Sequence, residues 1–268
     1  MHALLALLLL AAPAAPAAPR DEDDPFLQEA TAEWTQDGRV FAFTQRLPTG
    51  SGSDEPSTVV DLWTQKVSHL SSGTSSCQSE DDAVAKRCQA EQKKAHAAFD
   101  KQWKRLVPGT TTQVHSAKGL PVQVANGTLT STPPSRPSHA LSVPGAAAET
   151  VHLYAAPDGQ WAVAAIGTSE DSDPAKLYVV PLVARVDLLD AGAGAGIDET
   201  AKKLEQAGYK PSHTARAGSP HARTEVFFQA GFEPEAKEVA KALGLAAEAI
   251  QPCTWATAYG ITVAAAKP

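Results

Sequence analysis

The first two thirds of the chain carry short runs of apolar and β-branched residues separated by turn residues, which is the pattern of antiparallel strands. Asp37-Gly38 is a hairpin turn signal, because a type I′ turn needs positive φ at both central positions. Val40–Phe43, directly after it, predicts a strand. A second strand is predicted at Thr58–Trp63, and the segment Pro48–Pro56 between the two predicts a loop.

The same order of turn and strand returns later in the chain. Asp158-Gly159 precedes the apolar run Trp161–Ala164, and Lys176–Leu182 predicts the outgoing strand. Propeller blades recur about every 40–50 residues, and the two copies here lie much further apart than that. We therefore expect one antiparallel sheet or a small sandwich rather than a propeller.

One segment within this β region has helical periodicity. Apolar or small residues recur at three- and four-residue steps between Asp81 and Leu106, which predicts an amphipathic helix that ends at Pro108-Gly109. Basic residues lie largely elsewhere on its surface; they include Lys93, Lys94, Lys101, Lys104 and Arg105. They indicate either a binding face for anionic polymers or a solvated helix face, and the solvated face is the favoured interpretation.

A further hairpin and a loop complete the β-rich region. Gln113–Thr130 predicts a hairpin with its turn at Asn126-Gly127. Ser131–His139 is rich in proline and serine and predicts a loop without regular structure. Because the second turn-and-strand copy follows this loop, the loop interrupts the first domain rather than ending it.

The last part of the chain predicts a compact strand–helix–strand–strand–helix–strand block. Strands are expected at Arg185–Asp190, at Glu225–Gln229 as a central strand, and at Ile261–Ala265. The first helix is expected to start with Asp198 as its N-cap and to stop at Gly208. The second helix has Pro234 in its first turn and is closed by Gly244.

These patterns predict an α+β fold with two domains. An N-terminal antiparallel β-rich domain with one long helix spans 27–183, and a small α/β C-terminal domain spans 184–268. Residues 1–19 have the short apolar run and small-residue end of a secretory signal peptide, and 20–26 form a flexible lead-in. No later apolar stretch is long enough to span a bilayer. We therefore expect an exported protein, in the periplasm or outside the cell.

Charge and cysteine content limit the classes of partner and of site. The net charge of −7 does not favour binding to nucleic acid or to an anionic membrane, because both are negatively charged. Cys77 and Cys88 are close enough in sequence to close a short loop, and we predict a disulfide between them. Cys253 is left over, and three cysteines without paired C-x-x-C spacing argue against zinc.

The C-terminal block resembles a known family. The features that carry the resemblance are the strand and glycine-rich turn Val186–Gly196, the helix end Gln206–Tyr209, the aromatic strand Thr224–Phe228, and the stretch Gly231–Ala236 running into Gly244. Residues of about 184–266 are thereby similar to the C-terminal domain of LytR/CpsA/Psr cell-envelope proteins. That family usually opens the turn with Asn-Gly, where Asp190-Ala191 stand here. The family's phosphotransferase domain is a separate unit with no counterpart in residues 1–183, so the resemblance implies an accessory module without the enzyme.

Residues 27–183 resemble other proteins only in short stretches. The Asp37-Gly38 and Asp158-Gly159 elements are similar to the blade turns of TolB-like propellers and to an uncharacterised family of bacterial secreted proteins.

No constellation in the sequence indicates catalysis, a cofactor or a metal. Gly192, Gly194 and Gly196 lack the G-x-G-x-x-G spacing of a dinucleotide site. His213 and His221, with Ser212 and Ser219, are expected in a loop without the rigid elbow that a serine nucleophile needs. His152 is expected on a sheet face, and Asp171–Asp173 lacks the glycine and glutamate of a calcium loop.

The sequence therefore favours a non-enzymatic cell-envelope protein that binds or organises a cell-wall polymer or a periplasmic partner. Two alternatives stay open: a glycan hydrolase using N-terminal carboxylates such as Asp61 or Glu170, and a protein–protein scaffold. An exposed patch of Trp34, Trp63 and Trp161 would favour a binding module. Burial of all three would make them core, which is the favoured expectation.

Overall fold

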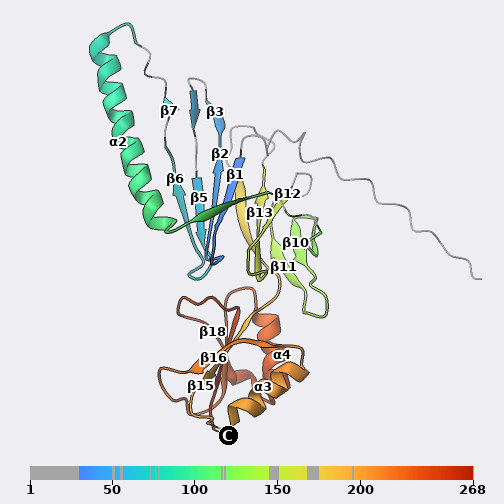
Figure 1. Cartoon of the computed structure of the whole chain (residues 1–268). Helices are drawn as coiled ribbons and strands as arrows, with labels where there is room; N and C mark the ends of the chain where they lie inside the picture. The colour runs from blue at the N-terminus through green and yellow to red at the C-terminus, as the bar shows by residue number, and fades with distance from the viewer. Residues whose placement is uncertain are drawn as a thin grey trace, which may run out of the picture.

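The computed structural model of the chain describes residues 30–49, 52–54, 57–72, 74–75, 77, 79–115, 117, 119–144, 151–167, 175–194 and 196–267 (Figure 1). The predicted signal peptide (1–19) and lead-in (20–26) lie outside the described residues, as do Glu170 and Asp171–Asp173.

A five-stranded antiparallel sheet carries the long helix on one face. Its order is β6-β5-β2-β1-β8, formed by Lys66–Leu70, Ser57–Asp61, Val40–Gln45, Ala30–Thr35 and Thr111–Val114. Successive strand residues point to opposite faces, so Val40 and Ala42 meet α2 (Asp82–Leu106) while Phe41 and Phe43 face the other way. Helix α2 contributes Phe99, Trp103 and Leu106 to this contact.

Two three-stranded antiparallel sheets stack on the far side of the first sheet. The middle sheet, β12-β13-β14, consists of Val151–Ala155, Trp161–Ile166 and Lys176–Pro181. All residues of β13 are buried, because Trp161 and Val163 pack towards the first sheet while Ala162 and Ala164 pack towards the outer one. The outer sheet, β11-β10-β9, consists of His139–Ser142, Thr128–Ser131 and Val122–Ala125. Helix and sheets follow one another as layers in Figure 1.

The N-terminal architecture confirms the α+β class with one long helix, and the predicted strands and helix are present. Three stacked sheets replace the single sheet or small sandwich. The predicted loop Pro48–Pro56 overlaps two short strands, β3 (Leu47–Thr49) and β4 (Gly52–Asp54), which form a small sheet with β7 (Thr74–Ser75). Both central residues of the Asn126-Gly127 turn have positive φ, as predicted, at 50° and 69°.

The Asp37-Gly38 turn is not of the expected type. Only Gly38, with φ of 69°, takes the left-handed conformation. The Asp37 carboxylate instead accepts hydrogen bonds from the Arg39 N–H and the Thr35 hydroxyl, which stabilises a longer loop between β1 and β2.

The C-terminal part is a mixed sheet with both helices on one face. The sheet order is β16-β15-β19-β17-β18, and only the β17–β19 pair is antiparallel. The strands are Pro211–Arg216, Val186–Asp190, Ile261–Ala265, Glu225–Phe228 and Ile250–Pro252. Helices α3 (Gly196–Gln206) and α4 (Glu233–Leu243) contribute Leu204, Val239 and Ala240 to the core, and the short 3-10 helix η2 (Ala247–Ala249) precedes β18.

Four details of this block differ from the sequence expectation. His213 lies in the strand β16 rather than in a loop. β16 is an edge strand that pairs only with β15, and its polar residues face solvent. Strand β19, not the strand at Glu225–Phe228, is central, and β18 was not anticipated. Helix α3 starts at Gly196, so Asp198 lies in its first turn rather than at the N-cap, where its carboxylate still complements the helix dipole.

Helix α2 is held at its start by local bonds rather than by burial. Asp81 caps it by accepting from the N–H groups of Ala83 and Val84, and no residue of the helix is fully buried. Cys88 in its second turn is joined to Cys77, with the Cα atoms 5.5 Å apart. The bond therefore ties a poorly packed helix end to the segment after β7.

We expect this disulfide to form in the isolated protein and to contribute about 2–3 kcal/mol to stability, the value of the loop-entropy model for so short a loop. A non-reducing peptide map should recover the peptides of Cys77 and Cys88 as one linked species. Recovery of both residues as free thiols would contradict the bond.

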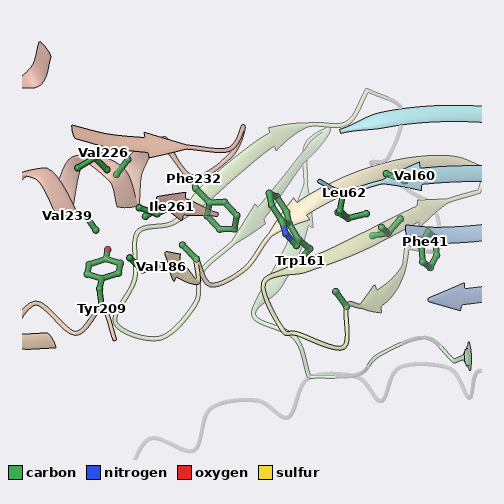
Figure 2. Packing of buried hydrophobic residues seen from close by; sticks show 14 of the residues in the cluster. Phe41, Val60, Leu62, Trp161, Val186, Tyr209, Val226, Phe232, Val239 and Ile261 are labelled. Atoms are coloured by element: carbon green, nitrogen blue, oxygen red, sulfur yellow. The ribbon is translucent and has the colours of Figure 1, made fainter. Parts of the chain in front are cut away.

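The N-terminal layers and the C-terminal block share a continuous apolar core (Figure 2). The Phe232 ring meets the Trp161 ring edge-on at 4.5 Å between centroids. Gly260 allows this approach, because a Cβ atom there would lie 2.6 Å from the Phe232 ring. Gly231, with φ of 95°, lies against Pro181 in the same way. The two parts therefore meet in a packed seam.

Candidate functional site

A buried glutamine joins the two parts by hydrogen bonds. The Gln160 carbonyl oxygen accepts from the N–H groups of Arg185 and Gly260. Its amide nitrogen donates to Asp158 Oδ2 and to the Ala258 carbonyl oxygen. Gln160 is fully buried, and so is Gly260, while the other three partners are half-buried. These hydrogen bonds fix the start of β15 and the loop before β19 relative to the middle sheet.

The Pro/Ser-rich loop Ser131–His139 also contacts the C-terminal block. Arg136 stacks on the Tyr209 ring at 3.9 Å and donates to the Gly208 carbonyl oxygen. Burial and a hydrogen bond to Glu238 raise the pKa of the Tyr209 phenol. At the end of the loop, His139 Nε2 lies 2.7 Å from Glu235 Oε1 of α4, and both side chains are buried.

A groove of about 330 Å³ lies along this seam. Its wall combines the β5–β6 turn, the end of β17 and the loop after β18; it consists of Trp63, Thr64, Gln65, Phe228, Gln229, Ala230, Pro252, Cys253, Thr254, Trp255 and Ala256. No charged residue is among them. We call this site the tryptophan groove, because Trp63 and Trp255 bring an indole ring from each part of the chain.

The Trp63 side of the groove is held in place by a carboxylate. Asp61 accepts from the N–H groups of Trp63 and Thr64 and forms an ion pair with Arg39 at 2.9 Å. The hydrogen bond that the Arg39 guanidinium donates to Asp61 raises the pKa of Arg39. The Arg39 guanidinium lies 5.0 Å from the centre of the Trp63 ring, within cation–π range. The indole is therefore oriented before any ligand arrives.

The Trp255 side is more open. Trp255 is 44% exposed, the largest exposure of any tryptophan in the described part of the chain. Its ring rests edge-on against Phe227 at 4.9 Å, which leaves the rest of the indole available. Beside it, the Cys253 thiol donates to the Trp255 carbonyl oxygen, and burial raises the pKa of that thiol. Cys253 is therefore a wall residue rather than an activated nucleophile.

Two glutamines also line the groove. Gln229 is buried and donates to the carbonyl oxygens of Thr257, at 2.7 Å, and Trp63, at 3.3 Å. Gln65 has a positive φ of 54°, and its amide donates to the Ala230 carbonyl oxygen. A non-glycine residue in this conformation carries backbone strain, which is common where a site is held in shape.

A second pocket of about 480 Å³ continues along the seam and shares Gln65 and Ala230 with the groove. It opens between β11 and β14, and its wall is mostly apolar, with Leu129, Leu141 and Val179 among its residues. His139 lines it, so the buried pair with Glu235 lies against this pocket.

The candidate residues named from the sequence do not assemble into a catalytic centre. His213 pairs with Asp187 and His221 with Glu225, each at 2.7 Å, and neither ring is hydrogen-bonded to a serine hydroxyl within the described ranges. Asp61 is occupied by Arg39 and backbone N–H groups. No group of three potential metal ligands occurs in the described part of the chain.

The remaining candidate residues belong to the sheets, the glycine-rich turn or the core. His152 is buried in β12, on a sheet face as expected. The glycine-rich turn is ordered by Asp190, whose carboxylate accepts from the N–H groups of Gly192 and Gly194; these bonds lower its pKa. Of the three tryptophans considered together, Trp34 and Trp161 are core residues, at 0% and 3% exposure, and only Trp63 reaches the groove.

Sequence reasoning missed the groove because its parts come from distant segments. Trp63 was noted, but Trp255 was not, and nothing in the local pattern around either residue marks a shared site. The one available signal was a tryptophan in a loop bounded by Pro252 and Gly260, where a large apolar side chain has no strand or helix to pack in.

Comparison with known proteins identifies the C-terminal part only. Residues 184–265 match the family model LytR_C, described as LytR cell envelope-related transcriptional attenuator. The predicted resemblance is thereby confirmed for this region. Searches of curated proteins and of solved structures gave no significant match. The family match indicates a function associated with the cell envelope. Within the described residues, no helix has the length and apolar character needed to cross a membrane.

Proposed function

We propose that the protein is an exported, non-enzymatic cell-envelope module that binds an uncharged sugar portion of a cell-wall polymer in the tryptophan groove. In this proposal residues 1–19 are the signal peptide, 27–183 form the β-rich domain and 184–268 form the LytR_C-like domain. The observation that carries the proposal is the presence of both Trp63 and Trp255 in the wall of one groove that has no charged wall residue.

The wall chemistry suits a sugar ring. A pyranose has an apolar C–H face that packs on an indole and a rim of hydroxyls that need hydrogen-bonding partners. Trp63 and Trp255 supply aromatic surface, and Thr64, Gln65 and Thr254 supply neutral polar groups beside it. In pockets with apolar walls and a few polar groups, the polar groups fix the orientation of the ligand.

The hydrolase alternative has less support. Glycoside cleavage uses two carboxyl groups about 5–9.5 Å apart on either side of the bond. The tryptophan groove has no acidic wall residue, and Glu233 is the one acidic residue in the wall of the neighbouring pocket. Binding without cleavage is therefore the function that these two pockets support best.

Truncation of Trp255 should weaken sugar binding at least tenfold. Aromatic residues at the centre of a binding site typically contribute about 2 kcal/mol or more when removed, and Trp255 is 44% exposed, with its ring resting edge-on against Phe227. Titration of the full chain with N-acetylglucosamine oligomers, followed by tryptophan fluorescence, should show a higher dissociation constant for Trp255→Ala than for the wild type.

The matched control is Trp103→Ala, which removes a half-buried tryptophan on α2, away from the groove. It should leave the dissociation constant within about twofold of the wild-type value. Equal weakening by both variants, or no change with Trp255→Ala, would contradict a sugar site at the groove. The melting temperature of each variant separates lost binding from lost folding.

A further inference from the structure

Helix α2 carries a stripe of positive charge that is not part of the tryptophan groove. Its residues Asp82–Leu106 include seven basic and three acidic side chains, a net charge of +4 in a chain whose net charge is −7. The rest of the chain therefore carries −11. Such segregation concentrates positive potential on one element of an acidic protein.

The seven cations share one face of the helix. With about 100° between successive residues, they fall within an arc of about 120°; they are Lys86, Arg87, Lys93, Lys94, Lys101, Lys104 and Arg105. The other residues in that arc are Ala83, Ala90 and Ala97, and the three acidic residues lie outside it. We call this face the cationic stripe; it runs for about 28 Å at 1.5 Å per residue.

The stripe is turned away from the body of the protein. Phe99, Trp103 and Leu106, which pack on the first sheet, lie on roughly the opposite side of the helix. All seven cationic side chains are exposed, and none has an ion pair or side-chain hydrogen bond within the ranges that the structure describes. Figure 1 shows α2 at the outer side of the layered sheets.

We propose that the cationic stripe binds a linear phosphate-bearing polymer laid along the helix. Charge complementarity selects a polyanion, and a straight row of cations suits an extended chain. Five of the seven are lysines, compact point charges that bind phosphate without the bidentate geometry of arginine. The stripe has alanine but no large apolar or aromatic side chain, so it lacks the anchors of a protein interface or of a membrane-inserting helix. This site is separate from the tryptophan groove.

The test uses the full chain and long-chain inorganic polyphosphate as the probe. The stripe variant is Lys94→Glu, Lys101→Glu and Arg105→Glu; the matched control is Lys202→Glu, Lys210→Glu and Lys241→Glu, exposed residues of the C-terminal block. Both variants change the net charge equally, so bulk charge cannot separate them. We expect the stripe variant to lose at least tenfold in affinity and the control to stay within about threefold of the wild type.

Salt dependence gives a second readout. If four to seven phosphates are contacted, log K should fall with log salt with a slope of about −3 to −5, since each contact on a flexible strand contributes about −0.7. Absence of polyphosphate binding by the wild type, or equal loss in both variants, would overturn the proposal. So would equal or tighter binding of polyglutamate or of anionic lipid vesicles. Because sugar binding is measured separately with the uncharged oligomers, failure of one site does not imply failure of the other.

Discussion

Replacing His139 with alanine should lower the free energy of unfolding by about 3–5 kcal/mol. The side chains of His139 and Glu235 are 5% and 0% exposed and lie 2.7 Å apart. Removal of His139 leaves the carboxyl group of Glu235 without its hydrogen-bonding partner beside the second pocket, and a broken buried pair costs about that much. The pair also joins β11 to α4, so the effect should include loosening of the seam. Urea unfolding of the full chain measures it.

A double variant distinguishes the cost of the unpaired carboxyl group from the cost of lost packing. His139→Leu with Glu235→Met replaces both partners by apolar side chains of similar size, which is often neutral or stabilising at buried ion pairs. We expect the double variant to be more stable than His139→Ala by at least about 2 kcal/mol. If it is as unstable as the single variant, the loss comes from shape at this site and not from the unpaired carboxyl group.

Replacing Gln160 with methionine should cost about 3–5 kcal/mol, although the volume changes little. The change removes four hydrogen bonds at once and leaves the N–H groups of Arg185 and Gly260 and the carbonyl oxygen of Ala258 without this partner. Each buried polar group left unpaired costs about 1–3 kcal/mol. Urea unfolding monitored by tryptophan fluorescence should show a lower midpoint for Gln160→Met than for the wild type.

Gln89→Met is a suitable comparison, because this exposed residue lies on α2, away from the seam. It should change the free energy of unfolding by less than about 1 kcal/mol. A Gln160→Met variant as stable as the wild type would mean that the buried amide does not hold the two parts together.

The elements that sequence predicted well are those with strong local signals. Asn126-Gly127 supplies two residues that tolerate positive φ, and the turn forms there with both in that conformation. Helix α2 follows from its apolar spacing and from Asp81, which can cap it. Alternation in β2 also separates the two faces that pack on α2 and on the middle sheet.

The elements that were missed, or expected but not located, have weak or misleading local signals. Strand β16 has the sequence Pro-Ser-His-Thr-Ala-Arg, with no large apolar residue, because an edge strand on this sheet needs little burial on either face. Strand β18 has three residues, too few for any periodicity. Asp37-Gly38 resembles a two-residue hairpin turn, but the carboxylate of Asp37 stabilises a longer loop instead.

The candidate site is a product of tertiary structure. Trp63 and Trp255 come from distant parts of the chain, and Gln160, which follows the Asp158-Gly159 turn, is fully buried where these parts meet. The cationic stripe differs, because its spacing is visible in the sequence. The structure added that the apolar face is covered by the first sheet while the cations stay exposed.

Co-sedimentation with purified peptidoglycan sacculi tests the central proposal most directly. The full chain should pellet with the sacculi, and the double variant Trp63→Ala, Trp255→Ala should stay largely in the supernatant while keeping its fold by circular dichroism. Pelleting should persist at high salt, since the groove wall is uncharged. A wild type that stays in the supernatant while a known wall-binding protein pellets would contradict the proposed function. Equal pelleting of the double variant at high salt, where binding by the cationic stripe is screened, would contradict it too.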